Sequence, residues 1–69
     1  MKTQITLSEL RKEENLSQRD LAKIVHVSAA TIGFYETGKR TPPLERAISI
    51  AEYFNLPVER IRFSNKQVE

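Results

Sequence analysis

Side chains that carry most catalytic and metal chemistry are scarce in this chain of 69 residues. It has no cysteine and one histidine, His26, which excludes disulfides and thiolate metal sites and leaves no basis for a metal. Glu13 and Glu14 are adjacent, so on a helix they face different ways and do not form a carboxylate pair. No glycine-rich loop could cradle a phosphate. The chain is therefore predicted not to be an enzyme and to need no cofactor.

Residues suited to recognition are concentrated instead in the segment 25–40, VHVSAATIGFYETGKR. Four of them share one helix face at the spacing i, i+3, i+4, i+7, namely Ala30, Gly33, Phe34 and Thr37. Ile32 and Tyr35 occupy the opposite face. Ala, Gly and Phe have no hydrogen-bonding side-chain group, and such a stripe is unusual on a monomer's surface. What it can contact depends on the elements that position it.

Three helix starts position this segment. Each has an apolar residue before a hydroxyl residue and a second apolar residue four positions after it, the pattern of an N-cap with a hydrophobic staple. The occurrences are Ile5-Thr6…Leu10, Leu16-Ser17…Leu21 and Val27-Ser28…Ile32. Glu9 completes a capping box with Thr6, and Asp20 makes a shorter one with Ser17. Helices are predicted to start near residues 7, 18 and 29.

Residues that tolerate left-handed backbone predict the helix ends. Asn15 stops the first helix, and Gly38 stops the third. His26 falls in a three-residue connection between helices over about 18–25 and 29–37, and histidine is enriched at positive φ. We interpret His26 as a turn residue, with a pH-sensing or phosphate contact as the alternative. So short a connection makes the two helices cross steeply, as in a helix-turn-helix.

The second half of the chain predicts two further helices. Paired prolines block a helix before Leu44 and suit a helix start there. Apolar residues at helical spacing then indicate a fourth helix up to Asn55: Leu44, Ala47, Ile48, Ala51 and Phe54. Pro57 opens a short fifth helix. Residues 62–64 could also pair with residues 3–5 as a small two-stranded edge.

These elements predict a single all-α domain over residues 1–69, a compact five-helix fold with a core over 6–62 and a frayed tail over 63–69. Its length leaves room for one core. The net charge of +2 is by itself weak evidence for nucleic acid. The first residues lack an apolar h-region and no run approaches membrane-spanning length, so we expect a cytoplasmic protein without a membrane segment.

The stretch from Leu7 to Ile61 resembles the Xre/Cro/phage-repressor helix-turn-helix family. Its most specific elements are LSQRDLA at 16–22, VSAATI at 27–32 and YETGKRTPP at 35–43, which follow the order and spacing of the family. The resemblance implies a five-helix, repressor-like DNA-binding domain. In that family the third helix lies in the major groove and the start of the second meets the DNA backbone.

Site residues follow from the resemblance by position. The implied phosphate contacts are Ser17, Gln18, Arg19, Lys23, Thr37, Lys39 and Arg40. The implied base contacts are Ser28, Ala29, Ala30, Thr31, Gly33 and Phe34. For the charged residues, an ordinary solvated surface is the alternative. Arg11 and Glu36 are implied to form a partly buried ion pair that fixes the third helix against the first; phosphate contact by Arg11 is the alternative.

Three explanations compete for the apolar stripe on the third helix. Ala and Phe could pack on thymine methyl groups while Gly33 allows close approach, so that T-rich half-sites and DNA shape carry specificity. Phe34 could instead fold back onto the core. The stripe could also meet another protein.

We therefore expect a sequence-specific transcriptional regulator, a dimeric repressor of a bacterium or phage that reads a palindromic operator in double-stranded DNA. A homodimer is expected because one such helix buries too little surface for tight specific binding. Its surface is expected in the second half, although most of these residues also serve the monomer's core: Phe54, Leu56, Val58, Ile61 and Phe63. The alternative function is a protein-interaction module of antitoxin or anti-repressor type. No small-molecule effector is indicated.

Overall fold

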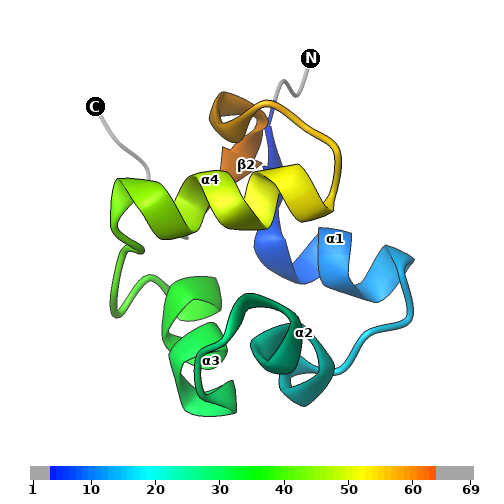
Figure 1. Cartoon of the computed structure of the whole chain (residues 1–69), viewed down its shortest axis with the longest axis vertical. Coiled ribbons are helices and arrows are strands. Elements are labelled where there is room, and N and C mark those ends of the chain that lie inside the picture. Colours follow the sequence, from blue (N-terminus) through cyan, green and yellow to red (C-terminus); the bar gives the residue numbers. More distant parts are fainter. Residues whose placement is uncertain (1–3, 64–69) are drawn as a thin grey trace.

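The structure, a computed structural model, describes residues 4–63 and has four α-helices in that range (Figure 1). Their bounds are α1 (Leu7–Glu13), α2 (Gln18–Val25), α3 (Ala29–Thr37) and α4 (Leu44–Tyr53). One 3₁₀ turn, η1 (Val58–Arg60), follows α4, and two short strands, β1 (Ile5–Thr6) and β2 (Ile61–Arg62), pair in parallel. No helix in the described range is long and apolar enough to cross a membrane.

Hydroxyl side chains cap the first three helices. Thr6, Ser17 and Ser28 each accept a hydrogen bond from the backbone N–H three residues later. The Thr6 box is closed by Glu9, whose carboxylate accepts from the Thr6 N–H at 3.0 Å. Asp20 closes the Ser17 box with the same length. All three predicted helix starts are thereby confirmed, because each cap satisfies a backbone donor that the helix leaves free.

Left-handed residues close the helices, at Asn15, His26 and Gly38 as the sequence predicts and at Asn55 in addition. Asn15, His26 and Asn55 have φ angles of 59°, 64° and 61°, and Gly38 has 83°. After each of the three non-glycine residues, an apolar residue donates its N–H five residues back, Leu16 to Arg11, Val27 to Ala22 and Leu56 to Ala51. This closure is of the Schellman type. His26 therefore serves as a turn residue.

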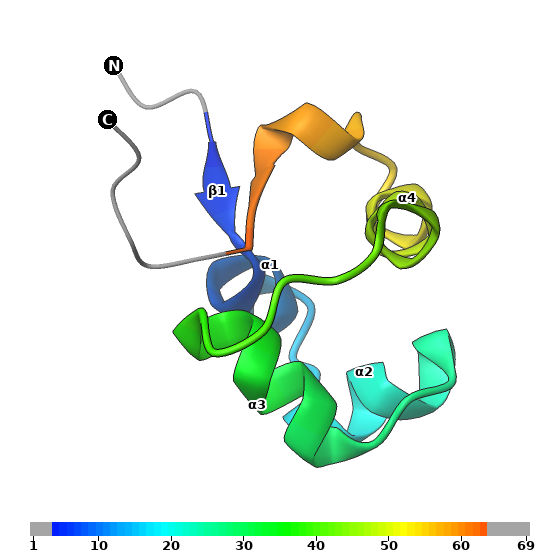
Figure 2. The ribbon, with the colours of Figure 1, turned by 90° about the vertical axis from the view of Figure 1, so that its left-hand side faces the viewer.

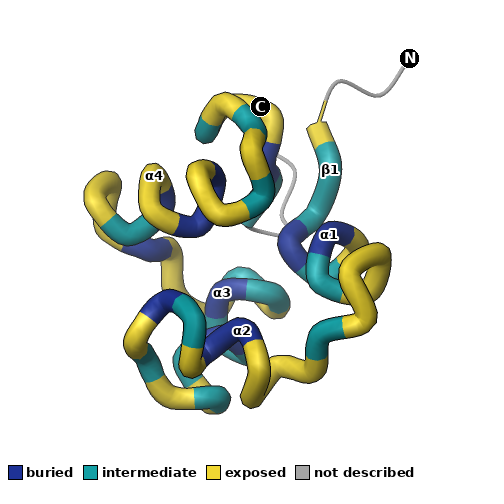
Figure 3. The backbone as a smooth tube through the Cα atoms, turned by 45° about the vertical axis from the view of Figure 1, so that its right-hand side comes forward, coloured by how far each residue is buried: buried dark blue, intermediate teal, exposed yellow. Residues whose placement is uncertain are grey.

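One face of each helix builds the core, together with Ile61 from β2. The largest fully buried side chains come one from each helix: Leu7, Leu21, Ile32 and Ile50. Figure 3 shows the buried positions of the four helices turned toward one another. Because α2 and α3 both contribute to this shared core, their relative orientation is fixed by packing as well as by the short turn.

The predicted fifth helix is wrong. Pro57 opens only the 3₁₀ turn η1, and Ile61 then adopts extended backbone with φ −102° and ψ 130°. Pairing Ile61 with Ile5 in a parallel ladder requires that extended backbone, so the helix cannot continue. The fourth helix also ends earlier than predicted, at Tyr53, with Asn55 in the left-handed conformation.

The small two-stranded pairing forms, but both strands are shifted from the prediction, β1 to a later position than residues 3–5 and β2 to an earlier position than residues 62–64. Its ladder pairs Ile5 with Ile61 and Thr6 with Arg62, and Figure 2 shows β1 running beside the segment of η1 and β2. Of the predicted partners, residues 3 and 64 lie outside the described residues, as do residues 64–69 of the expected frayed tail. Phe63, the first residue of that predicted tail, instead packs against the core. Burial of Ile61 explains the register, because it places this side chain in the core.

The inward face of α4 is also rotated from the predicted stripe. Ala47, Ile50 and Ala51 are buried, whereas Leu44 and Ile48 are 69% and 39% exposed. Helical spacing alone groups Leu44 with Ala47 and Ile48. In the structure, the face of α4 that carries Ile50 packs on the other helices, and the side chains of Leu44 and Ile48 are left exposed.

Candidate nucleic-acid interface

Helices α2 and α3 form a helix-turn-helix whose connection is the three residues 26–28. The two helices pack mainly against each other. Figures 1 and 2 both show them at one end of the molecule, across from α4 and the strands. The outer side of α3 is therefore turned away from the body of the domain.

We call the outward residues Ala30, Gly33, Phe34 and Thr37 the α3 stripe. Ala30 and Thr37 are exposed, and Gly33 and Phe34 are half-buried. On the opposite face Ile32 and Tyr35 are buried in the core, as their spacing predicts. Ala29, another predicted base contact, is half-buried and packs against the core. Much of its methyl group is therefore used within the domain.

The hydroxyl groups near the stripe already have partners inside the chain. Ser28 Oγ caps Thr31 N and lies 2.8 Å from Thr31 Oγ1, so one of these two hydroxyls keeps its proton free to donate. Thr37 Oγ1 donates back to the carbonyls of Gly33 at 3.1 Å and Phe34 at 3.4 Å. A phosphate oxygen only accepts hydrogen bonds, so Thr37 could contact it only after releasing these carbonyls.

A connected set of hydrogen bonds holds α3 to α1 and α2. Arg11 Nε donates to Glu36 Oε2 at 2.6 Å, and Arg11 Nη2 donates to Glu36 Oε1 at 3.2 Å. Arg11 Nη1 donates to the Leu16 carbonyl at 2.9 Å. The two charged side chains are only 11% and 8% exposed. The ion pair implied by the resemblance is thus present, and it commits Arg11 to the scaffold.

Gln18 joins the same set from the first position of α2. Its Nε2 donates to Glu36 Oε1 at 3.0 Å. A side-chain amide carries two N–H groups, so the second remains available to a phosphate. A Cβ atom at Gly33 would lie 3.8 Å from both polar atoms of the Gln18 amide, an ordinary contact distance. Gln18 therefore lies across the stripe and is oriented by Glu36.

The start of α2 gathers several predicted phosphate contacts. Ser17, Gln18 and Arg19 are exposed there, and Lys23 is exposed in the last turn of the same helix. Its first N–H groups lack partners within the helix and attract anions. The negative charge of Asp20 partly opposes this attraction. Hydrogen bonds with the backbone and then the side chain of Ser17 lower the pKa of the Asp20 carboxyl below the ordinary 3.8. Asp20 is therefore ionised at neutral pH.

Phe34 has neighbours that sequence spacing does not reveal. The guanidinium carbon of Arg40 lies 5.1 Å from the centre of the Phe34 ring, and Lys39 Nζ lies 6.0 Å from it. The three side chains line a shallow hollow of about 230 Å³. Among the described residues, the half-buried apolar side chains packed against the core do not include Phe34. This arrangement does not support a Phe34 that folds back onto the core.

The predicted dimer residues already pack within the single chain. Ile61 is 4% exposed and belongs to the core, so it offers almost no surface to a second copy. The other four are half-buried against the core: Phe54, Leu56, Val58 and Phe63. Tyr53, which no sequence pattern singles out, is 45% exposed and meets Phe54 edge to face at 5.0 Å.

Another interaction that the sequence does not predict joins α3 to α4. Arg46 Nη1 donates to the hydroxyl oxygen of Tyr35 at 3.2 Å. Tyr35 is otherwise buried in the core, so this bond satisfies its polar end. The only sequence signal is an arginine near the start of α4, which is too common to be specific.

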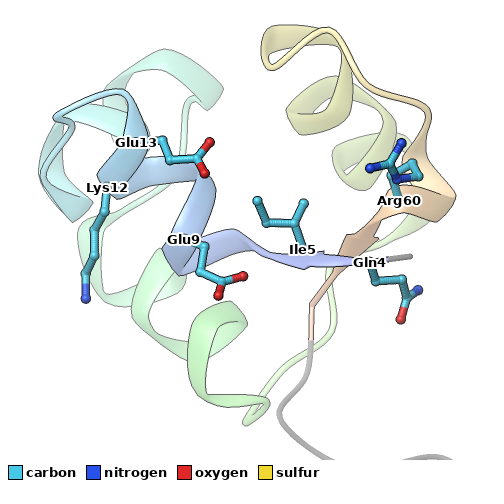
Figure 4. A pocket seen from close by; sticks show the side chains of 6 residues that line it. All are labelled: Gln4, Ile5, Glu9, Lys12, Glu13 and Arg60. Atoms are coloured by element: carbon cyan, nitrogen blue, oxygen red, sulfur yellow. The ribbon is translucent and has the colours of Figure 1, made fainter. Parts of the chain in front are cut away.

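A separate hollow on the described residues lies away from this interface. Its volume is about 590 Å³, and Figure 4 shows it lined by Gln4, Ile5, Glu9, Lys12, Glu13 and Arg60. None of these side chains comes from α2 or α3. Both signs of charge alternate around it, and two of its members are in use elsewhere, since Glu9 caps α1 and Gln4 donates to the Glu59 carbonyl.

Comparison with known proteins agrees with this geometry. A helix-turn-helix family model matches residues 7–61. An uncharacterized HTH-type transcriptional regulator of Archaeoglobus fulgidus is 44% identical over 61 residues, covering 88% of this chain and 83% of that protein. A putative HTH-type transcriptional regulatory protein of Methanothermobacter thermautotrophicus is 43% identical, covering 77% and 17%. The HTH-type transcriptional activator BcrR of Enterococcus faecalis is 33% identical, covering 80% and 27%.

The chain therefore belongs to the Xre/Cro-like helix-turn-helix family of DNA-binding transcription regulators. Members of this family are typically non-enzymatic DNA-binding proteins. The chain spans most of the Archaeoglobus relative, but only 17% and 27% of the two longer relatives.

Proposed function

We propose that this protein is a sequence-specific repressor that binds a palindromic operator as a homodimer, with α3 in the major groove. The observation that carries the proposal is the outward α3 stripe, flanked on one side by the start of α2 and on the other by Lys39. A helix offers groove contacts at its face and backbone contacts at its flanks in just this arrangement.

The proposed base contacts are dominated by methyl and ring surfaces. Ala30 and Phe34 meet thymine methyl groups, and Gly33 lets the helix approach closely. Ser28 and Thr31 share one free hydroxyl proton for a base or phosphate acceptor, and Ala29 adds the exposed part of its methyl group. Sparse hydrogen bonding favours T-rich half-sites and leaves part of the specificity to DNA shape.

The proposed phosphate contacts lie at the two flanks of α3. Those at the start of α2 and on its exposed face are Ser17, Gln18, Arg19 and Lys23. Those at and just after the end of α3 are Thr37 and Lys39. Gln18 is the best placed of these, because Glu36 orients its amide while one N–H remains free.

We place the dimer surface around the half-buried Phe54, Leu56, Val58 and Phe63, extended by the exposed Tyr53. Two domains reading half-sites about one helical turn apart would double the buried surface. Occupation of an operator that overlaps a promoter would then block transcription. The relative BcrR is named an activator, so activation is the alternative to repression. An in vitro transcription assay with the operator placed over or upstream of a promoter distinguishes the two.

Salt dependence tests the groove-binding proposal. The logarithm of the binding constant for duplex DNA should fall linearly with the logarithm of salt concentration, with a slope of about −0.9 per phosphate contact. Replacing Arg19 or Lys23 by alanine should make that slope less steep, by about 0.9 for each phosphate that the variant no longer neutralises. Lys12→Ala is the matched control, because Lys12 lines the hollow beside β1. Equal slopes for all four proteins would show that Arg19 and Lys23 contact no phosphate, and a slope near zero for the wild-type protein would favour the protein-interaction alternative.

A further inference from the structure

Arg40 is tied to Phe34 twice. Its guanidinium carbon lies 5.1 Å from the centre of the Phe34 ring, and its backbone N–H donates to the Phe34 carbonyl at 3.3 Å. Gly38, with a φ angle of 83°, reverses the chain between them and allows this return. The Arg40 side chain therefore lies against Phe34, a residue of the α3 stripe.

A guanidinium placed over a ring keeps its N–H edge available. Arg40 is exposed, and among residues 4–63 no acceptor bonds its guanidinium. Its planar fork matches two acceptors that lie side by side, whereas the ammonium of the neighbouring Lys39 acts as a point charge. In the major groove, O6 and N7 of guanine are such a pair, and arginine is their commonest partner.

We propose that Arg40 is a specificity-determining residue that binds O6 and N7 of a guanine, and that Phe34 is the platform that orients it. This inference rests on the proposed groove binding by α3. It replaces the phosphate role that the resemblance implies for Arg40 and leaves that role to Lys39. Each half-site then carries a guanine next to the thymine that Phe34 contacts.

The test uses the duplex that the wild-type protein selects from a randomised pool. Each guanine is replaced in turn by 7-deazaguanine, which lacks N7 but keeps Watson–Crick pairing. One replacement per half-site should weaken wild-type binding by roughly 5- to 150-fold, as expected when a bidentate interaction is broken. Arg40→Met should be insensitive to that same replacement, because its side chain has no N–H group to donate to N7. Lys39→Ala should bind every duplex more weakly and remain sensitive to it.

Variants of Phe34 test the platform. Phe34→Leu keeps an apolar side chain but removes the ring, and it should lose the sensitivity to 7-deazaguanine. Phe34→Tyr keeps the ring and should retain it. Circular dichroism should give each variant the helix content of the wild-type protein, which excludes general unfolding as the cause.

The outcomes separate the two proposals. If Arg40→Met weakens all duplexes alike and keeps the wild-type sensitivity, Arg40 is a phosphate contact and the inference is wrong. The same conclusion follows if no guanine replacement affects the wild-type protein. If the wild-type protein selects no sequence at all, groove reading itself fails, and the role of Arg40 fails with it.

Discussion

Arg11 and Glu36 lie 25 residues apart and are joined by two hydrogen bonds, at 2.6 Å and 3.2 Å, that pin α3 to α1. The same carboxylate receives the amide of Gln18. One acidic side chain thus orients α3 and the first residue of α2 together. The charge pair is nearly shielded from water, and the charge on both partners makes its hydrogen bonds stronger than neutral ones.

Removal of one partner of this pair should be costly. Arg11→Met is expected to lower the free energy of unfolding by about 3 kcal/mol, because it leaves the Glu36 carboxylate nearly buried without its cation. Urea denaturation measures the change. Lys12→Met, on the exposed side of α1, should shift it by no more than about 0.5 kcal/mol. Adding Glu36→Leu to Arg11→Met should recover part of the loss; no recovery would mean that burial of an unpaired charge is not the cause.

Gly33→Ala should raise stability and lower DNA affinity. The added Cβ meets the Gln18 amide only at ordinary contact distance, so the helix gains up to about 1 kcal/mol in propensity. Thermal denaturation should show a higher Tm. In fluorescence anisotropy, the same variant should bind the selected duplex more weakly, because its methyl group holds α3 away from the groove floor. Unchanged or tighter binding would show that close approach at Gly33 is not required.

Phe34 should recognise the thymine methyl group. Replacing the relevant thymine by uracil removes only that methyl, and wild-type binding should weaken about 4-fold, the value of one buried methylene-sized group. Phe34→Ala should bind both duplexes equally. If Phe34→Ala still distinguishes thymine from uracil as the wild type does, the thymine-methyl contact belongs to another residue, and Ala30 would be the next to test.

Asp20 should make stability depend on pH in the acid range. Hydrogen bonds from Ser17 lower the pKa of the folded carboxyl below its ordinary 3.8, so the unfolded chain takes up the proton first as pH falls. The contribution of Asp20 is therefore complete above about pH 3.8 and is lost as pH falls through the lower folded pKa. Urea denaturation between about pH 2 and 6 measures it. Asp20→Asn should lack this component; identical pH profiles would rule it out.

Local signals in the sequence were enough to predict the helix starts and turns. The caps Thr6, Ser17 and Ser28 and the turn residue His26 act on backbone groups within a few positions, so neighbouring residue types determine them. Positions that depend on packing between distant segments were not predictable in this way. Ile61 is drawn into a strand by Ile5, more than fifty residues earlier.

In the candidate site, too, features set by local spacing were predictable and features set by packing were not. Helical spacing was sufficient to place the α3 stripe on one face, and the family resemblance supplied the Arg11–Glu36 pair. The approach of Arg40 to Phe34 depends on how the chain reverses at Gly38, which spacing does not encode. Exposure of Leu44 and Ile48 likewise follows from the rotation that packing gives α4.

Binding-site selection tests most directly whether α3 reads a palindromic operator. The purified full chain is incubated with a randomised duplex pool at near-physiological salt, and bound duplexes are amplified and sequenced. We expect a two-fold symmetric site with T-rich half-sites about one helical turn apart. Enrichment of no sequence, with only salt-sensitive binding left, would contradict sequence reading by α3 and would assign its apolar stripe to a protein partner.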